Sequence, residues 1–308
     1  MQLFYTDVFA LPLPAGHRFP MEKYSRLRQA LLESGEFAIG DFHLPHAAGD
    51  EELARAHDPG YIRQVCCGQL SEKAQKAIGF PWSAGMVERA RRSAGATICA
   101  CRSALKRRSV AANLAGGTHH AFRDRGEGFC VFNDAAVAAR AMQAEGRARR
   151  ILIVDCDVHQ GNGTASILAG DDSIFTFSIH GARNFPFAKE QSDLDIELPD
   201  GCSDDAYLAQ LDHGLATACD LARPDLVIYR AGADPYADDR FGRLALSFAG
   251  LAERDRRVFS AARTLGVPVA VAMAGGYARN IDDTVRIHAT TIRLARHHWE
   301  QPAIRSRR

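Results

Sequence analysis

The sequence predicts an α/β protein with a single domain over residues 1–308, built on an open, mostly parallel sheet with helices on both faces. Short apolar runs typical of buried strands alternate with helix-length stretches from residue 110 onward. Polar side chains follow several of these runs, as they do at the ligand-binding edge of parallel sheets. No repeat, low-complexity block or Pro/Ser-rich linker divides the chain, so one domain is expected.

The expected elements begin in a first section of about 80 residues that mixes loops with helical stretches. Within it, residues 23–33 carry apolar side chains at helical spacing. A long alanine-rich helix over 83–108 follows, with Gly85 and Gly95 as points of close packing. Strands are then expected over 110–114, 151–154, 174–179, 225–229 and 267–273, and helices over 133–145, 205–221, 249–265 and 282–296.

Composition excludes several classes of protein. The chain is 46% apolar and 24% charged, which is typical of a globular protein in water. Its net charge of +1 offers no basic field for nucleic acid. No run approaches the roughly 20 apolar residues of a membrane span. The eight cysteines show no regular framework, which favours a reducing, cytoplasmic setting. A homo-oligomer stays open.

The polar run after residues 151–154 predicts a metal site. Residues two apart on an extended backbone point the same way, so Asp155, Asp157 and His159 are expected to converge at the strand's carboxyl end. Two carboxylates and an imidazole suit a divalent metal that keeps an open position. Asp234 follows the strand 225–229 and can supply a third ligand beside Asp157 and His159. The structural alternatives are an Asp-rich turn and a helix cap.

Two further clusters predict acid–base and electrostatic catalysis. His119 and His120 follow a glycine pair at a strand end, which favours a general base and a general acid beside the metal. Asp155 is then free to accept a hydrogen bond from an imidazole. Tyr277 also follows two glycines, and its hydroxyl can stabilise a developing oxyanion. Taken alone, each of these residues would more commonly be a packing or surface residue.

In their order and spacing, these clusters resemble the motif series of the zinc-dependent histone deacetylase superfamily. The resemblance spans most of the chain and implies the fold that deacetylases share with arginases. Residues 18–24, 124–130 and 157–163 resemble the class IV branch and its bacterial relatives most closely. The matching runs are Gly116–Ala121, Gly128–Asp134, Asp155–Thr164, Gly232–Asp234, Asp239–Ser247 and Gly275–Tyr277.

The resemblance implies one Zn²⁺ held by Asp157, His159 and Asp234. It implies that His120 is the general base for the attacking water and that His119 assists as an acid or electrostatic partner. Tyr277 would donate to the substrate carbonyl.

A structural potassium ion and a substrate tunnel are also implied. Asp155 would support His119 and ligate K⁺ together with backbone oxygens near Asp157, His159, Ser178 and Ile179. The tunnel residues would be Gly128 and Phe129 on one wall, Phe185 or Phe187 on the opposite wall, and Gly275 and Gly276.

Two departures from the family pattern matter. Asn162 stands where class I members carry an aspartate behind the second histidine, and a neutral amide orients His120 without adding charge. We therefore expect Asn162→Ala to cost less activity than Asp155→Ala. The acidic rim residue of class I enzymes has no clear equivalent. Pro81 and Trp82 fall near that position, which predicts an apolar mouth and weak peptide contacts.

The predicted function is zinc-dependent hydrolysis of acetyl or longer acyl groups from acyl-lysine in a protein or peptide. An acetylpolyamine or another small acyl-amine is the nearest alternative substrate, and long fatty-acyl groups stay open. An arginase-like ureohydrolase would need a second pair of aspartate ligands, and Asp238-Asp239 and Asp282-Asp283 lack strand-end context. A non-catalytic acyl-ligand sensor would need no general base, which His120 supplies.

Overall fold

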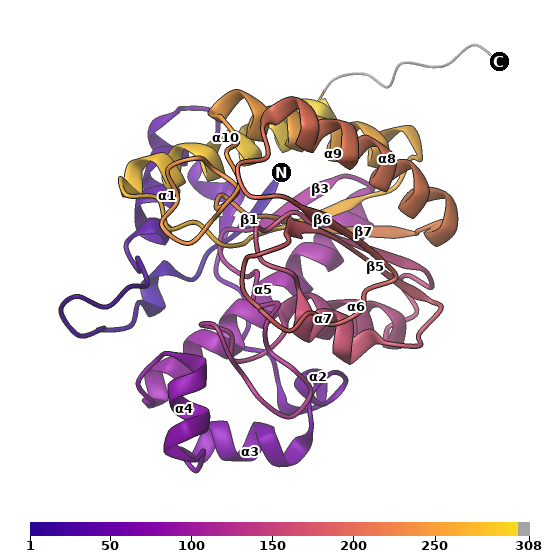
Figure 1. Cartoon of the computed structure of the whole chain (residues 1–308). Helices are drawn as coiled ribbons and strands as arrows, with labels where there is room; N and C mark the ends of the chain where they lie inside the picture. The colour runs from indigo at the N-terminus through magenta and orange to yellow at the C-terminus, as the bar shows by residue number, and fades with distance from the viewer. Residues whose placement is uncertain (301–308) are drawn as a thin grey trace.

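Eight parallel strands form one sheet at the centre of the structure, a computed structural model that describes residues 1–300 (Figure 1). The strand order is β2-β1-β3-β8-β7-β4-β5-β6, and every neighbouring pair is parallel. The strands are β1 (Gln2–Phe4), β2 (Phe42–His43), β3 (Val110–Asn113), β4 (Ile151–Asp155), β5 (Ile174–Gly181), β6 (Leu194–Leu198), β7 (Leu226–Ala231) and β8 (Val269–Met273).

Helices cover both faces of this sheet (Figure 1). One face carries α1 (Lys23–Glu33), α8 (Asp204–Ala222), α9 (Phe248–Thr264) and α10 (Ile281–Glu300), and the other carries α5 (Ala84–Arg107), α6 (Asp134–Ala144) and α7 (Asn162–Leu168). Beyond α5 lie α2 (Asp50–Ala54), α3 (Pro59–Cys67) and α4 (Glu72–Ile78). Single 3₁₀ turns cover Asp7–Phe9 and Ile39–Asp41. Among residues 1–300, no helix is long and apolar enough to cross a membrane.

The apolar runs form strands because both faces of the sheet are buried. In β4, Ile151 and Ile153 pack in the core beneath α5 and α6, whereas Leu152 and Val154 pack in the core beneath α8 and α9. All four side chains are buried. A strand covered on both sides reads as a continuous apolar run, which explains why these strands could be predicted.

The predicted α/β class is confirmed, and every predicted helix and strand is present to within a few residues. The sheet proves parallel throughout the described residues rather than mostly parallel. Strands β1, β2 and β6 were not predicted, because the first two are very short and the third alternates apolar and acidic residues at an edge. The expected domain range, 1–308, extends past the described residues.

Sheet order brings the polar clusters together. The strands β3, β8, β7 and β4 are consecutive neighbours, so the loops at their carboxyl ends meet at one edge. Asp155 ends β4 and pairs in register with Ser178 of β5 and Arg230 of β7. Strand β5 continues to Gly181, two residues beyond the predicted range 174–179, so both Ser178 and His180 lie within it.

Candidate active site and metal centre

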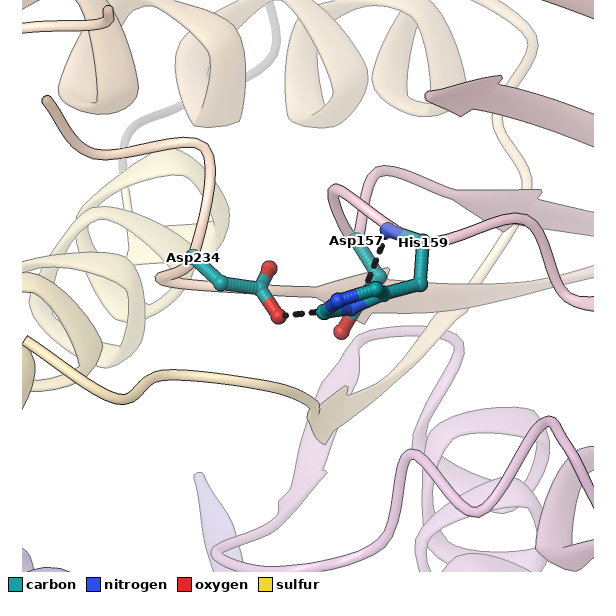
Figure 2. Close-up of side chains that lie close together, drawn as sticks. All are labelled: Asp157, His159 and Asp234. Carbon is teal, nitrogen blue, oxygen red and sulfur yellow. Dashed lines mark hydrogen bonds and ion pairs between the residues drawn. The ribbon is translucent and has the colours of Figure 1, made fainter. Parts of the chain in front are cut away.

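Three ligand-type side chains meet at this edge. Asp157 and His159 lie on the turn after β4, and Asp234 lies on the loop after β7 (Figure 2). Each offers a ligand atom, and these atoms all lie within 4.8 Å of one another. The Nδ1 atom of His159 is 2.9 Å from Asp157 Oδ1 and 3.3 Å from Asp234 Oδ2.

The turn, not an extended strand, produces this convergence. The strand ends at Asp155, and its Oδ1 accepts the backbone N–H of Asp157 at 3.1 Å. Asp157 Oδ1 in turn accepts the backbone N–H of His159 at 2.9 Å. The expectation that Asp155, Asp157 and His159 point the same way by strand alternation is therefore wrong. Asp155 instead accepts a hydrogen bond from His119.

The buried charges of the trio fit a cation. Burial and the charge of Asp157 raise the pKa of Asp234 to about 7. Burial opposes ionisation of His159, yet hydrogen bonds and charge from Asp157 and Asp234 raise its pKa to about 10. Asp234 Oδ2 is buried, and its ion pair with His159 is the only polar side-chain contact that it makes within the described part of the chain. A Cβ on Gly275 would collide with this carboxylate, so the glycine keeps the space clear. The donor set suits Zn²⁺.

His119 and His120 lie side by side, with ring centroids 4.1 Å apart. His119 Nδ1 donates to Asp155 Oδ2 at 2.8 Å, and its Nε2 lies 3.8 Å from Asp157 Oδ1. Arg230 holds Asp155 from behind, with Nη1 3.6 Å from the same carboxylate oxygen. Arg230 is fully buried, so its positive charge needs carboxylates close by. Asp155 and Asp134, the latter 3.3 Å away, provide them.

His120 has a neutral partner with an acid behind it. Its Nδ1 lies 2.6 Å from Asn162 Oδ1, and Asn162 Nδ2 donates to Glu127 Oε1 at 2.8 Å. A carboxylate only accepts, so the contact with Glu127 orients the amide and requires His120 Nδ1 to carry a proton. Nε2 is then the free acceptor. Burial, followed by the charges of His119 and His159, holds the pKa of His120 well below its usual value.

Tyr277 is anchored through its backbone. Asp239 Oδ2 accepts the Tyr277 N–H at 2.6 Å, and Asp239 Oδ1 accepts the N–H groups of Phe241 and Gly242. Lys23 lies 5.1 Å from the tyrosine ring and within 3.4 Å of the Gly276 carbonyl. Burial raises the pKa of Tyr277 well above its usual value, so the hydroxyl keeps its proton and can donate.

One cavity of about 880 Å³ is lined by His119, His120, Asp157, His159 and Tyr277. Gly128 and Phe129 lie on its wall, and a Cβ on Gly128 would approach His120 Cδ2 to 2.7 Å. Of the two aromatic candidates for the opposite wall, Phe185 is the inner one, with its ring 4.8 Å from that of His120. Phe187 is 85% exposed at the mouth. Gly275 lines the cavity, but Gly276 faces Thr284 and does not.

Three of the residues expected to bind potassium lie on β4 and β5 and outside the ligand trio: Asp155, Ser178 and Ile179. Ser178 and Ile179 are buried on β5, beside Asp155 of β4. The Ser178 hydroxyl lies 2.9 Å from His180 Nδ1. This second cation site stays a prediction.

The mouth differs from its predicted apolar character. Trp82 does not line the cavity; its indole donates to Val65 O at 2.8 Å, and the ring packs over Gly68. The lining of the mouth includes exposed residues from three loops: Arg18 before α1, Arg183 and Phe187 between β5 and β6, and Arg240 and Arg243 between β7 and α9. The mouth is charged because loops that are distant in the sequence come together to form it.

Sequence reasoning missed three supporting residues. Arg230 interrupts the apolar run of β7, and a buried charge in a central strand signals a nearby counter-ion. Glu127 stands between two glycines, a weak signal, and its link to Asn162 needs the folded chain. Asp239 lies inside a quoted family motif, but only the structure reveals its three backbone hydrogen bonds.

A parallel sheet whose carboxyl edge holds a buried ligand trio, a histidine pair and a phenol defines an amide-hydrolysing enzyme of the deacetylase fold. The histone deacetylase domain model matches residues 17–292, and the chain belongs to the histone deacetylase family.

The chain is also similar to individual proteins over most of its length. An uncharacterized protein of Picosynechococcus is 46% identical over 95% of this chain and 97% of its own. Histone deacetylase 2 of Arabidopsis thaliana is 30% identical over 91% of this chain and 75% of its own. The crystal structure of a histone deacetylase homologue from Aquifex aeolicus shares the fold, with a TM-score of 0.83 and 24% identity over 96% of this chain and 83% of that one.

Proposed function

We propose that the protein is a zinc-dependent amidohydrolase that removes acetyl or longer acyl groups from the side-chain amine of acyl-lysine. The observation that carries this proposal is the unlike pairing of two adjacent histidines. His119 donates to a carboxylate and His120 to a neutral amide, and both line one cavity together with Tyr277, Asp157 and His159. Asp234, 3.3 Å from the His159 ring, completes the ligand trio. A protein that only binds its ligand would not need two adjacent histidines with different hydrogen-bond partners.

Asp157, His159 and Asp234 would hold the zinc ion. When bound, the ion supplies Lewis-acid chemistry, acidifying water and polarising a carbonyl. The crowding of two buried carboxylates supports its presence, because a divalent charge offsets their repulsion. K⁺ beside Asp155 and Ser178 is proposed as a structural ion.

The side chains divide the proton transfers. His120, with its proton on Nδ1, accepts the proton of the attacking water at Nε2. Tyr277 donates its hydroxyl to the oxyanion that forms on the scissile carbonyl. The leaving amine then receives a proton from the histidine pair, where the Asp155 carboxylate stabilises a charged His119.

Acyl-lysine is favoured over an acetylpolyamine by the charge of the mouth. Exposed Arg18, Arg183, Arg240 and Arg243 line it, and a polyamine, which is a polycation, would be repelled. All eight cysteines lie within the described residues and are free thiols, which supports a reducing compartment such as the cytoplasm.

The test is a panel of acyl-lysine peptides from acetyl to long fatty-acyl chains, assayed beside acetylpolyamines and arginine. We expect hydrolysis of at least one acyl-lysine peptide, and its loss in His120→Ala with metal content unchanged. Faster turnover of acetylpolyamines would favour the small-amine alternative. Release of urea from arginine, with two manganese ions per chain, would refute the proposal.

A further inference from the structure

The cavity carries far more positive charge than the chain as a whole. The net charge of the protein is +1. The cavity lining nevertheless has only two acidic side chains, Glu127 and Asp157, and Asp157 belongs to the ligand trio. It has six cationic side chains, Arg18, Lys23, Arg89, Arg183, Arg240 and Arg243. A cleft lined by one sign of charge focuses the field at its mouth.

The cations at the mouth are poorly neutralised. Arg183 and Arg243 share one carboxylate, that of Asp200, at 3.9 and 3.1 Å. Arg240 donates to the Tyr277 carbonyl and forms no ion pair within residues 1–300. Their side chains are exposed, with 78% of Arg183 and 53% of Arg243 accessible. These guanidinium groups therefore remain available to an incoming anion.

The cations deeper in the cavity reinforce this field. Lys23 is 2% exposed and Arg89 is 8% exposed, and neither forms an ion pair with a described carboxylate. Lys23 Nζ lies near the Ala274 and Gly276 carbonyls. Arg89 stacks over Phe19 and Tyr24 instead. Dipoles and ring faces hold these charges in place without neutralising them.

We propose that the mouth of this cavity selects acyl-lysine residues flanked by aspartate or glutamate. The proposal rests on the deacylase function above and names its substrate class. With the acyl-lysine in the cavity, flanking carboxylates meet Arg183 and Arg243, which bind such groups through paired N–H donors. Lysine or arginine at the same flanks meets like charge. A peptide substrate rich in lysine and arginine around the acyl-lysine is therefore expected to bind weakly at this mouth.

Three peptides that differ only in the residues flanking the same acyl-lysine test this selection. The flanks are glutamate, glutamine or lysine, and kcat/KM is measured at low and high salt. We expect the order Glu above Gln above Lys, with about a tenfold span at low salt. The span arises mainly in KM and shrinks at high salt as the charges are screened.

Two double variants locate the effect. In Arg183→Gln/Arg243→Gln the ratio of the Glu to the Lys peptide falls towards one, and in Arg183→Glu/Arg243→Glu it inverts. The matched control, Lys106→Gln/Arg107→Gln, removes the same charge from the exposed last turn of α5, just before β3 and hence at the opposite edge of the sheet. It should keep the native ratio.

The results separate this inference from the deacylase proposal. Equal kcat/KM for the three peptides would overturn the charge selection. So would a control variant that loses the Glu-to-Lys ratio as fully as the arginine variants do. In either case, hydrolysis of the Gln peptide still shows that the protein is a deacylase. If no peptide is hydrolysed, the deacylase proposal fails. Fluorescence anisotropy of the Glu and Lys peptides then tests the selection by binding alone, and equal affinities would reject it.

Discussion

Asn162 donates its side-chain amide to Glu127 Oε1 at 2.8 Å while its own oxygen lies 2.6 Å from His120 Nδ1. His120 is therefore linked to a carboxylate only indirectly, through the side-chain amide of Asn162. Because the contact with Glu127 sets which way the amide points, it also sets which histidine nitrogen is free to act as a base.

Placing a carboxylate at position 162 should impair the enzyme. In Asn162→Asp, two carboxylates would face each other where one hydrogen bond now lies, and the proton shared between them would no longer orient His120 reliably. We expect kcat to fall about tenfold, equivalent to roughly 1.4 kcal/mol. Steady-state kinetics at saturating metal measure this.

A second substitution should rescue that variant. In Asn162→Asp/Glu127→Gln, the glutamine amide can donate to the new carboxylate, which pairs directly with His120. We expect kcat to return to at least the native value, with bound metal unchanged in both variants. A double variant no faster than Asn162→Asp would show that Glu127 plays no part.

Asp155 should matter more than Asn162. It accepts from His119, meets the fully buried Arg230 and caps the Asp157 N–H, so its removal leaves a buried charge partly unpaired. We expect kcat of Asp155→Ala to lie at least about tenfold below that of Asn162→Ala. Urea unfolding of both variants controls for lost stability. If kcat fell as far in Asn162→Ala as in Asp155→Ala, the prediction that activity depends less on Asn162 would be wrong.

Removing the Tyr277 hydroxyl should slow the chemical step. Tyr277→Phe keeps the ring contacts with Phe19, Phe129 and Phe241 but loses the donor, so kcat should fall about 10²–10³-fold with little change in KM. The matched control is Tyr5→Phe, which lies just after β1 and does not line the cavity. Native kcat in Tyr277→Phe would remove the phenol from the mechanism.

The protein should lose stability in mild acid partly through His57. Burial lowers the pKa of His57 from 6.5 to about 4, and its ring Nε2 accepts the Asn133 N–H at 2.8 Å. Between these values the unfolded chain binds a proton that the folded chain does not, so stability falls as the pH falls from 6.5 towards 4. From pH 7 to pH 5, His57 is expected to lower the free energy of unfolding by about 2 kcal/mol.

Urea unfolding at these two pH values measures the effect. In His57→Gln, whose side-chain oxygen can still accept the Asn133 N–H, the pH dependence should be shallower by that amount. The same slope in variant and native protein would exclude His57 as its source.

The fold and the chemistry of the site were predictable because they rest on local patterns. The apolar runs of β4 up to Val154, of β7 up to Tyr229 and of β8 are continuous because both faces of each strand are buried. Strands β3 and β5 are also rich in buried apolar residues. Asp157, His159 and Asp234 lie a few residues after strand ends, so the positions of their strands also determine theirs. Their mutual approach follows from the parallel sheet.

The remaining features depend on contacts between distant segments. Glu127 and Asn162 are 35 residues apart, and nothing local to either one signals their pairing. The direction of Asp155 depends on where β4 stops and on the position of His119. The charge of the mouth collects arginines from several loops, which is why the overall charge of +1 conceals it.

The central claim is that one divalent ion, held by Asp157, His159 and Asp234, is needed for amide hydrolysis. Its most direct test is to strip the protein of metal and add Zn²⁺ stepwise, while measuring bound ion per chain and the rate on an acyl-lysine peptide. We predict that activity rises in step with binding and saturates at one ion per chain, and that Asp234→Asn weakens both. Full activity in ion-free protein, or a requirement for two ions, would contradict the account.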